Sequence, residues 1–457
     1  MIRAVLPGTT MLLLLVSAAW AQDLPIERYA LPNGLQVILH VDHALPQVVV
    51  DVWYQVGSKD EAPGRSGFAH LFEHLMFMGT DRLPGSGIDQ LMEANGGWNN
   101  AWTMEDATNY YDVGPPNLLS TLLWIEADRM EQLGAAMTQE KVDLQRDVVR
   151  NERRQTSEDT PYGVGELEWA GLLFAKDHPY GHTVIGTHDD LEAAKLQEIK
   201  DFFATWYVPN NASLVVAGDI DPVAIKPVIE QYFGHLPQRA LPARVSPAAV
   251  TSVQKARVIV PDQVDLPQVT MLWHSPAAFT KDDVECQMLA SLLAEGESSR
   301  LYVKLVKAGL AQEVLAYQNA LSLGGTFLIQ ATAMEGVSIE KIEGIIQDEL
   351  AAIARTPPSA AEMERLHNQS EYAFLAGLQP LQNRAEMINR YLAYTGDPNY
   401  LAQDLARYRG VTAQGIAAAT AAWLQPSAGG AVVVVPEASI AAPNGAPTTT
   451  PSTGGAR

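Results

Sequence analysis

Residues 67–79 read GFAHLFEHLMFMG, and the interpretation of the whole chain starts from this run. Its polar side chains are His70, Glu73 and His74, and apolar residues surround them. A helix that is apolar on all sides is expected to be buried. On a helix, positions i and i+4 share one face with i+3 beside them, so the three ionisable groups converge. An unpaired buried polar group costs about 2–7 kcal/mol, so the pattern predicts a partner for all three.

Two histidines one helical turn apart, with a glutamate between them, are typical of a zinc site. A zinc ion bound by His70 and His74 would satisfy both imidazoles and leave Glu73 facing a metal-bound water. A buried hydrogen-bond cluster of the three side chains is the alternative, although that reading suits a lone histidine better than a pair. The sequence therefore predicts His70 and His74 as metal ligands and Glu73 as the base.

A catalytic zinc usually has three protein ligands and one position for water. The helix expected near 138–158 offers Glu152, which follows Val149 by three positions and Val148 by four. With Val142, these residues form an apolar stripe, so Glu152 is expected to point toward the core. It is the predicted third ligand. An ion pair with one of the neighbouring arginines explains this carboxylate equally well.

The chain has 457 residues, which is too long for one ordinary core and predicts two domains of roughly 200 residues. Both halves follow one order of strands, helices, a strand pair, helices and a last strand, which indicates an internal duplication. The predicted fold is α+β, with two homologous domains that each pack a mainly antiparallel sheet with helices. The expected divisions are a signal peptide over 1–21, a zinc-binding domain over 22–236, a linker over 237–254, a second domain without a metal site over 255–436 and a disordered tail over 437–457.

The first residues of the chain resemble a secretory signal. Arg3 precedes an apolar run over 11–16, and Ala19-Trp20-Ala21 fits a cleavage site. The run is too short to span a bilayer, so we expect cleavage, a periplasmic or secreted protein and no membrane anchor. Cys286 is the only cysteine, which excludes an intrachain disulfide, and it is expected to be a small core residue.

Acidic residues outnumber basic ones by 53 to 31, which gives a formal net charge of −22. Such a surface repels nucleic acid, so a nucleic-acid partner is not expected. The charge favours basic peptides as partners, although solubility alone explains it equally well.

Residues 67–80 carry an H-x-x-E-H motif and resemble the pitrilysin/insulinase family of zinc metallopeptidases, in its short bacterial form similar to the mitochondrial processing peptidases. In that family a downstream glutamate completes the metal site. Glu152 lies 78 positions after His74, in a segment over 148–154 that also resembles the family. The resemblance covers about residues 25–435 and implies that Glu152 is the third zinc ligand.

Residues 96–111 resemble the edge strand with which this family pairs the substrate backbone. The resemblance implies that Asn100 and Ala101 hold the peptide and that Trp102 lines the pocket after the cut bond. Main-chain pairing suits a site that accepts many sequences. The alternative is that this segment is an ordinary edge strand without a role in substrate binding. One departure is Gln145, where some members carry a glutamate, and it affects the tuning of the metal rather than its binding.

Family members of this length form half of a chamber that a second chain completes. Their zinc-less half supplies an arginine and a tyrosine near the metal, whereas residues 326–333 here contain neither. We therefore expect a homodimer, or a heterodimer with a zinc-less homologous subunit. The implied activity is zinc-dependent endopeptidase cleavage of peptides or unfolded polypeptides in the chamber. The alternative is a non-catalytic peptide-binding or assembly subunit. S-ribosylhomocysteinase, a small zinc lyase, shares the motif but not this length.

Overall fold

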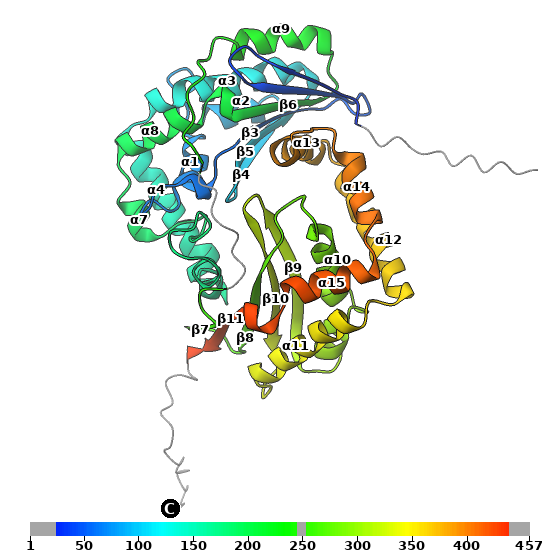
Figure 1. Ribbon diagram of the computed structural model, residues 1–457. Helices are drawn as coiled ribbons and strands as arrows, with labels where there is room; N and C mark the ends of the chain where they lie inside the picture. Colours follow the sequence, from blue (N-terminus) through cyan, green and yellow to red (C-terminus); the bar gives the residue numbers. More distant parts are fainter. Residues whose placement is uncertain (1–23, 245–252, 438–457) are drawn as a thin grey trace, which may run out of the picture.

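The computed structural model describes residues 24–244 and 253–437, which form two halves with one sheet each (Figure 1). The predicted signal peptide lies outside the described residues, as do most of the predicted tail and residues 245–252 of the predicted linker. Within the described ranges, no helix has both the length and the apolar character needed to cross a membrane.

The first sheet has six strands in the order β1-β2-β6-β3-β5-β4, so β4 forms an edge. Only β2 and β6 pair in parallel, and the other neighbours are antiparallel. The three central strands are rich in β-branched and aromatic residues and are buried throughout, which is typical of a sheet covered on both faces. The strands are β1 Ile26–Ala30, β2 Gln36–Val41, β3 Val48–Tyr54, β4 Trp98–Thr103, β5 Thr108–Gly114 and β6 Ala212–Gly218.

The second sheet has five strands in the order β7-β11-β8-β10-β9, with one parallel pair, β7 and β11. Without β1, this order and these directions repeat those of the first sheet, with β7 in the place of β2 and β9 in the place of β4. The prediction of an α+β fold with two homologous halves is confirmed. The strands are β7 Arg257–Asp262, β8 Gln268–Ser275, β9 Ala311–Leu321, β10 Gly324–Ala333 and β11 Gly430–Pro436.

Helices fill corresponding places in the two halves. The first half has α1 Phe68–Leu75 and α2 Gly87–Glu93 before β4, and α3 Leu119–Ala136, α4 Gln139–Arg153, α5 Gly163–Glu166, α6 Trp169–Leu173, α7 His188–Glu192 and α8 Leu196–Trp206 before β6, with α9 Pro222–Phe233 after it. The second half has α10 Asp283–Ala294 before β9, and α11 Ile339–Arg355, α12 Ala360–Gly377, α13 Leu381–Thr395, α14 Leu401–Arg409 and α15 Ala413–Trp423 before β11.

Residues 163–175 have a helical pattern in the sequence, but the chain forms α5 and α6 with a break between them. At Gly165 the backbone passes so close to β11 that an added Cβ would lie 2.6 Å from Val434. The helix α14 gives little signal in the sequence, because its buried apolar side chains, Leu401 and Leu405, are too few to set a clear period.

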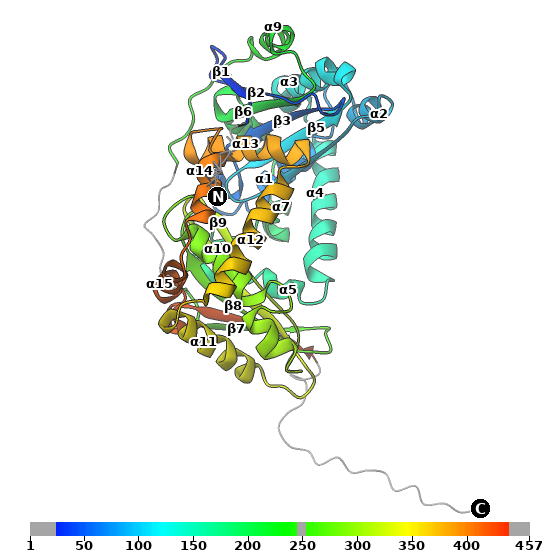
Figure 2. The same cartoon turned by 90° about the vertical axis from the view of Figure 1, so that its right-hand side faces the viewer.

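Each half lends helical cover to the other half's sheet. On the first sheet, α13 packs Ile388 and Leu392 against a face that includes Val49 and Val215, and Figure 1 shows α13 in orange directly under this sheet. On the second sheet, α6 and the residues after it supply the aromatic and aliphatic cover for strands β8, β10 and β11. Figure 2 shows α4 running down toward α5, a helix of the first half that contacts β7 and β11 of the second sheet. The two cores are therefore interlocked across the predicted linker.

This interlocking predicts that a helix of the second half stabilises the first sheet. Ile388 is fully buried against that sheet. We expect Ile388→Ala to lower the free energy of unfolding by about 2–5 kcal/mol, because a large-to-small change in a packed core leaves a cavity. Chemical denaturation measures the change. Tyr372→Ala on α12 is the control, since Tyr372 is 76% exposed and should shift stability by less than about 0.5 kcal/mol. Equal effects of the two substitutions would contradict the packing role of α13.

Candidate metal centre

The helix α1 presents one buried face and one open face. Phe68, Leu71, Phe72 and Leu75 point into the first core. His70, Glu73 and His74 lie on the other side and are only partly buried, so the expectation of a helix buried on all sides is corrected. The helix starts where the Glu61 carboxylate accepts hydrogen bonds from Gly67 N (3.0 Å) and Ala69 N (2.7 Å). An acceptor at this end satisfies free N–H groups and complements the helix dipole.

The helix α4 packs against α1 and brings Glu152 to it. Val142 and Val149 are fully buried, but Val148 is 39% exposed, so the predicted stripe is wrong at this position. Glu152 lies one turn after Val148, on the open side of α4 rather than in its core face. The ion-pair alternative for Glu152 is also wrong, because the neighbouring arginines have other acceptors: Arg150 donates to Glu192, Arg153 to Glu158 and Arg154 to Asn151.

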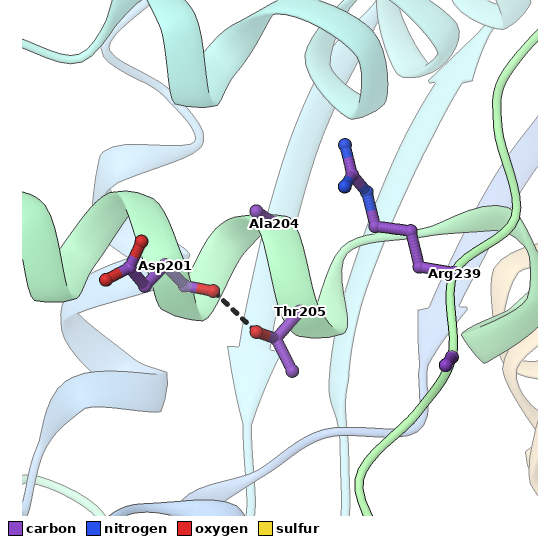
Figure 3. Close-up of a pocket in the computed structure, with 5 residues that line it drawn as sticks. Asp201, Ala204, Thr205 and Arg239 are labelled. Atoms are coloured by element: carbon purple, nitrogen blue, oxygen red, sulfur yellow. Dashed lines mark hydrogen bonds between the residues drawn. The ribbon is translucent and has the colours of Figure 1, made fainter.

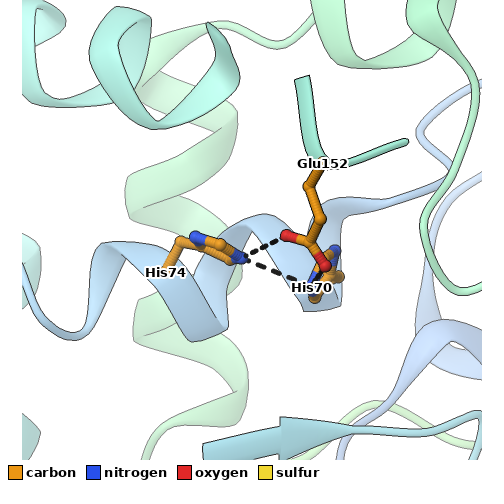
Figure 4. Close-up of side chains that lie close together, drawn as sticks. All are labelled: His70, His74 and Glu152. Carbon is orange, nitrogen blue, oxygen red and sulfur yellow. Dashed lines mark hydrogen bonds and ion pairs between the residues drawn. The ribbon is translucent and has the colours of Figure 1, made fainter. Parts of the chain in front are cut away.

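Three side chains converge between α1 and α4, as Figure 4 shows. The Nε2 atoms of His70 and His74 are 3.3 Å apart. The Glu152 carboxylate lies 3.1 Å from His74 Nε2 and 3.6 Å from His70 Nε2. In the part of the chain that the structure describes, this is the one group of three such side chains whose ligand atoms lie close enough to hold a metal ion. Ligands of a tetrahedral zinc are separated by about 3.3–3.6 Å. Two of the three separations here lie in this range and the third, 3.1 Å, is slightly shorter, so the donor set fits zinc.

The charges of the three groups suit a divalent cation. Burial, together with the nearby His74, lowers the pKa of His70 to about 4, against the attraction of Glu152. Burial also disfavours protonated His74, but its hydrogen bond to Glu152 and the charges of Glu152 and Glu73 together outweigh burial and raise its pKa. The hydrogen bond from His74, together with both imidazoles, holds the pKa of Glu152 below its ordinary value. Glu152 as an anion and His70 as a neutral imidazole are in the forms that bind a metal, whereas His74 would release its proton on binding one.

Glu73 lies beside this group on α1 and outside the set of ligand atoms. Thr103 Oγ1 donates a hydrogen bond of 2.5 Å to Glu73 Oε2, and burial raises the pKa of Glu73. Thr103 has no role among the residues predicted from the sequence. The alternation of a strand could have identified it, because Thr103 shares its side of β4 with Ala101 and follows the predicted substrate residues.

The edge strand β4 separates the predicted substrate residues onto two faces. Ala101 packs on the same side of the sheet as α1. Trp102 packs on the opposite side, where its ring meets that of Trp53 edge-on at 5.0 Å. A pocket lined by Trp102 would therefore lie on the α13 side of the edge rather than beside Glu73. Asn100 is exposed at the edge, and its Oδ1 accepts a hydrogen bond from Ala101 N (2.9 Å).

The backbone of Ala101 points away from β5. Met104 N donates to Ala107 O and closes the β4–β5 hairpin. Hydrogen-bonded and non-hydrogen-bonded pairs alternate along an antiparallel ladder, which makes the Ala101–Tyr110 pair non-hydrogen-bonded. The N–H and C=O of Ala101 are thus directed to the free edge, where an added strand could meet them.

A shallow hollow also lies on the first half, away from these residues. It has a volume of about 530 Å³ and is lined by Asp201, Ala204 and Thr205 of α8 and by Arg239 and Ala240 (Figure 3). Thr205 Oγ1 donates to the backbone oxygen of Asp201 within the helix. None of the residues of the metal centre lines this hollow.

Two family profiles match the chain. The profile described as "Insulinase (Peptidase family M16)" matches residues 36–165, and the one described as "Peptidase M16 inactive domain" matches residues 193–370. The first range includes His70, His74 and Glu152 together with the β4 edge.

Known proteins resemble the chain over most of its length. The zinc protease PqqE of Helicobacter pylori is 30% identical over 80% of this chain and 83% of its own. The crystal structure of a protease from the same organism has a TM-score of 0.85 at 26% identity and covers 91% of this chain and 100% of that one. The probable zinc protease PqqL of Escherichia coli is 26% identical over 77% of this chain but only 39% of its own length. The first half of that periplasmic protease shares the fold, with a TM-score of 0.72 over 91% of this chain and 92% of that one, at 20% identity. These matches confirm the predicted resemblance, and the chain belongs to the insulinase family of peptidases, family M16.

Proposed function

We propose that the chain is a zinc-dependent endopeptidase in which His70, His74 and Glu152 hold the metal and Glu73 is the catalytic base. The observation that carries this proposal is the convergence of three ligand atoms within 4.8 Å of one another. A fourth ionisable side chain, Glu73, lies beside them and is held separately by Thr103. A hydrogen-bond cluster with a purely structural role would not require a further carboxylate, that of Glu73, beside the three side chains. In this proposal residues 22–236 are the catalytic unit, and residues 255–436 are its metal-free counterpart.

The residues divide the chemistry between them. A bound zinc ion supplies polarisation of the scissile carbonyl and lowers the pKa of a bound water toward about 7. Glu73 accepts a proton from the attacking water and later gives it to the leaving nitrogen. Thr103 fixes the orientation of the Glu73 carboxylate through its hydrogen bond. His70, His74 and Glu152 are all partly exposed, which leaves room for a substrate to approach.

The substrate is proposed to be an extended peptide or an unfolded segment that adds as a strand to the β4 edge. The outward N–H and C=O of Ala101 support this, because main-chain hydrogen bonds bind a peptide without reading its side chains. The Asn100 side chain now accepts from Ala101 N, so it would move or exchange this bond when a strand binds. The net charge of −22 favours basic peptides.

We further propose that the chain works as a dimer, either with itself or with a zinc-less homologue, in the periplasm or outside the cell. The support comes from the Escherichia coli relative PqqL. This chain matches only 39% of the length of PqqL, and the first half of PqqL alone has the fold of this chain. A protein more than twice as long can supply both halves of a chamber, which a shorter chain obtains by association. That relative is described as periplasmic.

Metal content and peptide cleavage test the proposal together. We expect the purified chain to bind about one zinc per chain, since three ligands and a water complete one tetrahedral site. Cleavage of an unstructured basic peptide should disappear with a chelator and return with added zinc. Sedimentation under the assay conditions gives the oligomeric state. A fully active monomer would exclude the dimer, a zinc-bound chain inactive in every pairing would indicate a peptide-binding subunit, and a chain that binds no metal would overturn the proposal.

A further inference from the structure

One buried carboxylate joins the two halves of the chain in the turn that follows Thr103. Asp106 lies in the turn between β4 and β5 and is only 6% exposed. Its two oxygens receive hydrogen bonds or ion pairs from four residues in separate parts of the sequence. These are Ser322 through N and Oγ, both at 2.7 Å, Tyr180 OH at 2.7 Å, Tyr394 OH at 2.8 Å and Lys59 Nζ at 3.0 Å.

The donors come from both halves. Ser322 lies in the turn between β9 and β10, and Tyr394 lies on α13, so both belong to the second half. Burial alone would raise the pKa of Asp106, but Lys59 and the hydroxyl and amide donors hold it below its ordinary value. Asp106 is therefore an anion whose charge is satisfied from several directions. Such a carboxylate fixes its own backbone, because any displacement breaks charge-assisted hydrogen bonds.

The backbone of the same turn is held from its other side. Ser58 N and Lys59 N donate to the carbonyl oxygens of Met104 and Glu105 at 3.2 and 3.1 Å. This approach requires Gly57, because an added Cβ would lie 2.3 Å from Met104 O. The turn is thus clamped between residues 57–60 and the second half of the chain.

The clamped turn begins next to Thr103, which donates to Glu73. We propose that Asp106 is a positioning residue through which the second half of the chain sets Thr103 against Glu73. The second half then acts on the site without supplying a ligand or a reacting group. The kinetic consequence rests on the proposed peptidase function, whereas the structural consequence does not.

A double-mutant cycle tests the kinetic consequence. We expect Ser322→Ala combined with Tyr394→Phe to lower kcat about tenfold, because small misplacements of a reacting group are costly, while KM changes less than about twofold. Zinc content should stay the same. In a Thr103→Val background the same pair should lower kcat by less than about twofold further, since its effect passes through Thr103. In a Thr103→Ser background, which keeps the hydroxyl, the Ser322/Tyr394 pair should again lower kcat about tenfold.

The matched control is Tyr391→Phe, one turn earlier on α13. Tyr391 is also buried, but its hydroxyl donates to Asp404 at 3.0 Å, within the second half. This substitution removes a buried tyrosine hydroxyl of the same helix without touching the turn, so kcat should not change. The proposal is overturned if the Ser322/Tyr394 pair lowers kcat equally with and without Thr103, or if Tyr391→Phe lowers it as much.

Hydrogen exchange in the metal-free protein tests the structural consequence independently of activity. We expect the amides of residues 103–107 to exchange at least about tenfold faster in the Ser322/Tyr394 variant, since local opening depends on local contacts. Tyr391→Phe should leave these amides unchanged. Unchanged exchange in the Ser322/Tyr394 variant overturns the proposal. A wild-type chain without peptidase activity would instead remove the proposed function, while the exchange result would still decide the role of Asp106.

Discussion

We expect the replacement of Glu73 with glutamine to lower kcat for peptide cleavage by about 10²–10⁴-fold, the range typical for loss of a general base, and to leave zinc binding intact. The amide has the size of the carboxylate, and its oxygen can still accept the hydrogen bond from Thr103. It cannot take a proton from water. Glu73 is not among the three ligand side chains, so metal binding should be unaffected. Turnover of a fluorogenic peptide and metal analysis of the same sample measure both quantities.

The control for this substitution is Glu93→Gln at the exposed end of α2, which makes the same chemical change away from the site. It should leave turnover and zinc content at the wild-type level. Near-normal cleavage by Glu73→Gln would exclude Glu73 as the base. Loss of zinc from that variant would show instead that Glu73 helps hold the metal.

Removing a ligand should abolish cleavage through a different route, the loss of zinc. His74 has the central position, with Nε2 3.3 Å from His70 and 3.1 Å from Glu152. His74→Ala leaves two ligands, and we expect zinc affinity to fall by more than about 100-fold, since even outer partners of metal ligands are worth about 10–100-fold. Competition with a chromogenic chelator measures the affinity. Glu152→Gln should behave similarly, because an amide is a poorer ligand than a carboxylate.

Two controls separate ligand loss from general damage. His43→Ala removes an exposed histidine that pairs with Asp219. Glu158→Gln alters a carboxylate that pairs with Arg153 and His188, six positions after Glu152. Both variants should keep wild-type zinc affinity. Unchanged zinc affinity in His74→Ala would mean that the metal binds elsewhere.

The parts of the site that could be predicted are those set by local geometry. His70, Glu73 and His74 converge because helix periodicity alone places them together. Glu152 was harder, because its position depends on how α4 packs against α1. The alternative was an ion pair between Glu152 and a neighbouring arginine. It is excluded only because each of these arginines has another acceptor. Val148 was predicted to be buried but is exposed, because the position of a valine in a helical stripe does not reveal that this side of the helix faces solvent.

Contacts between distant segments account for what could not be predicted. Thr103 and Asp106 have partners 30 to 288 positions away, including Glu73 and Tyr394, and no short pattern records such pairs. The amphipathic pattern of α13 likewise shows that one face is buried but not which sheet covers it. The repeated order of strands was predictable, because each half repeats the alternation and turn signals of its own strands.

The helix α13, which belongs to the second half but covers the first sheet, also affects the order in which the chain can fold. One face of the first sheet is covered by Ile388 and Leu392, which are made long after its last strand, β6 Ala212–Gly218. During synthesis this face stays uncovered until residue 395 is available, whereas the larger core of the first half is built from residues 31–236. Domains generally fold as units once their residues are present, so packing on both faces of the first sheet waits for most of the chain. The chain therefore keeps one apolar face of its first sheet exposed until its synthesis is nearly finished.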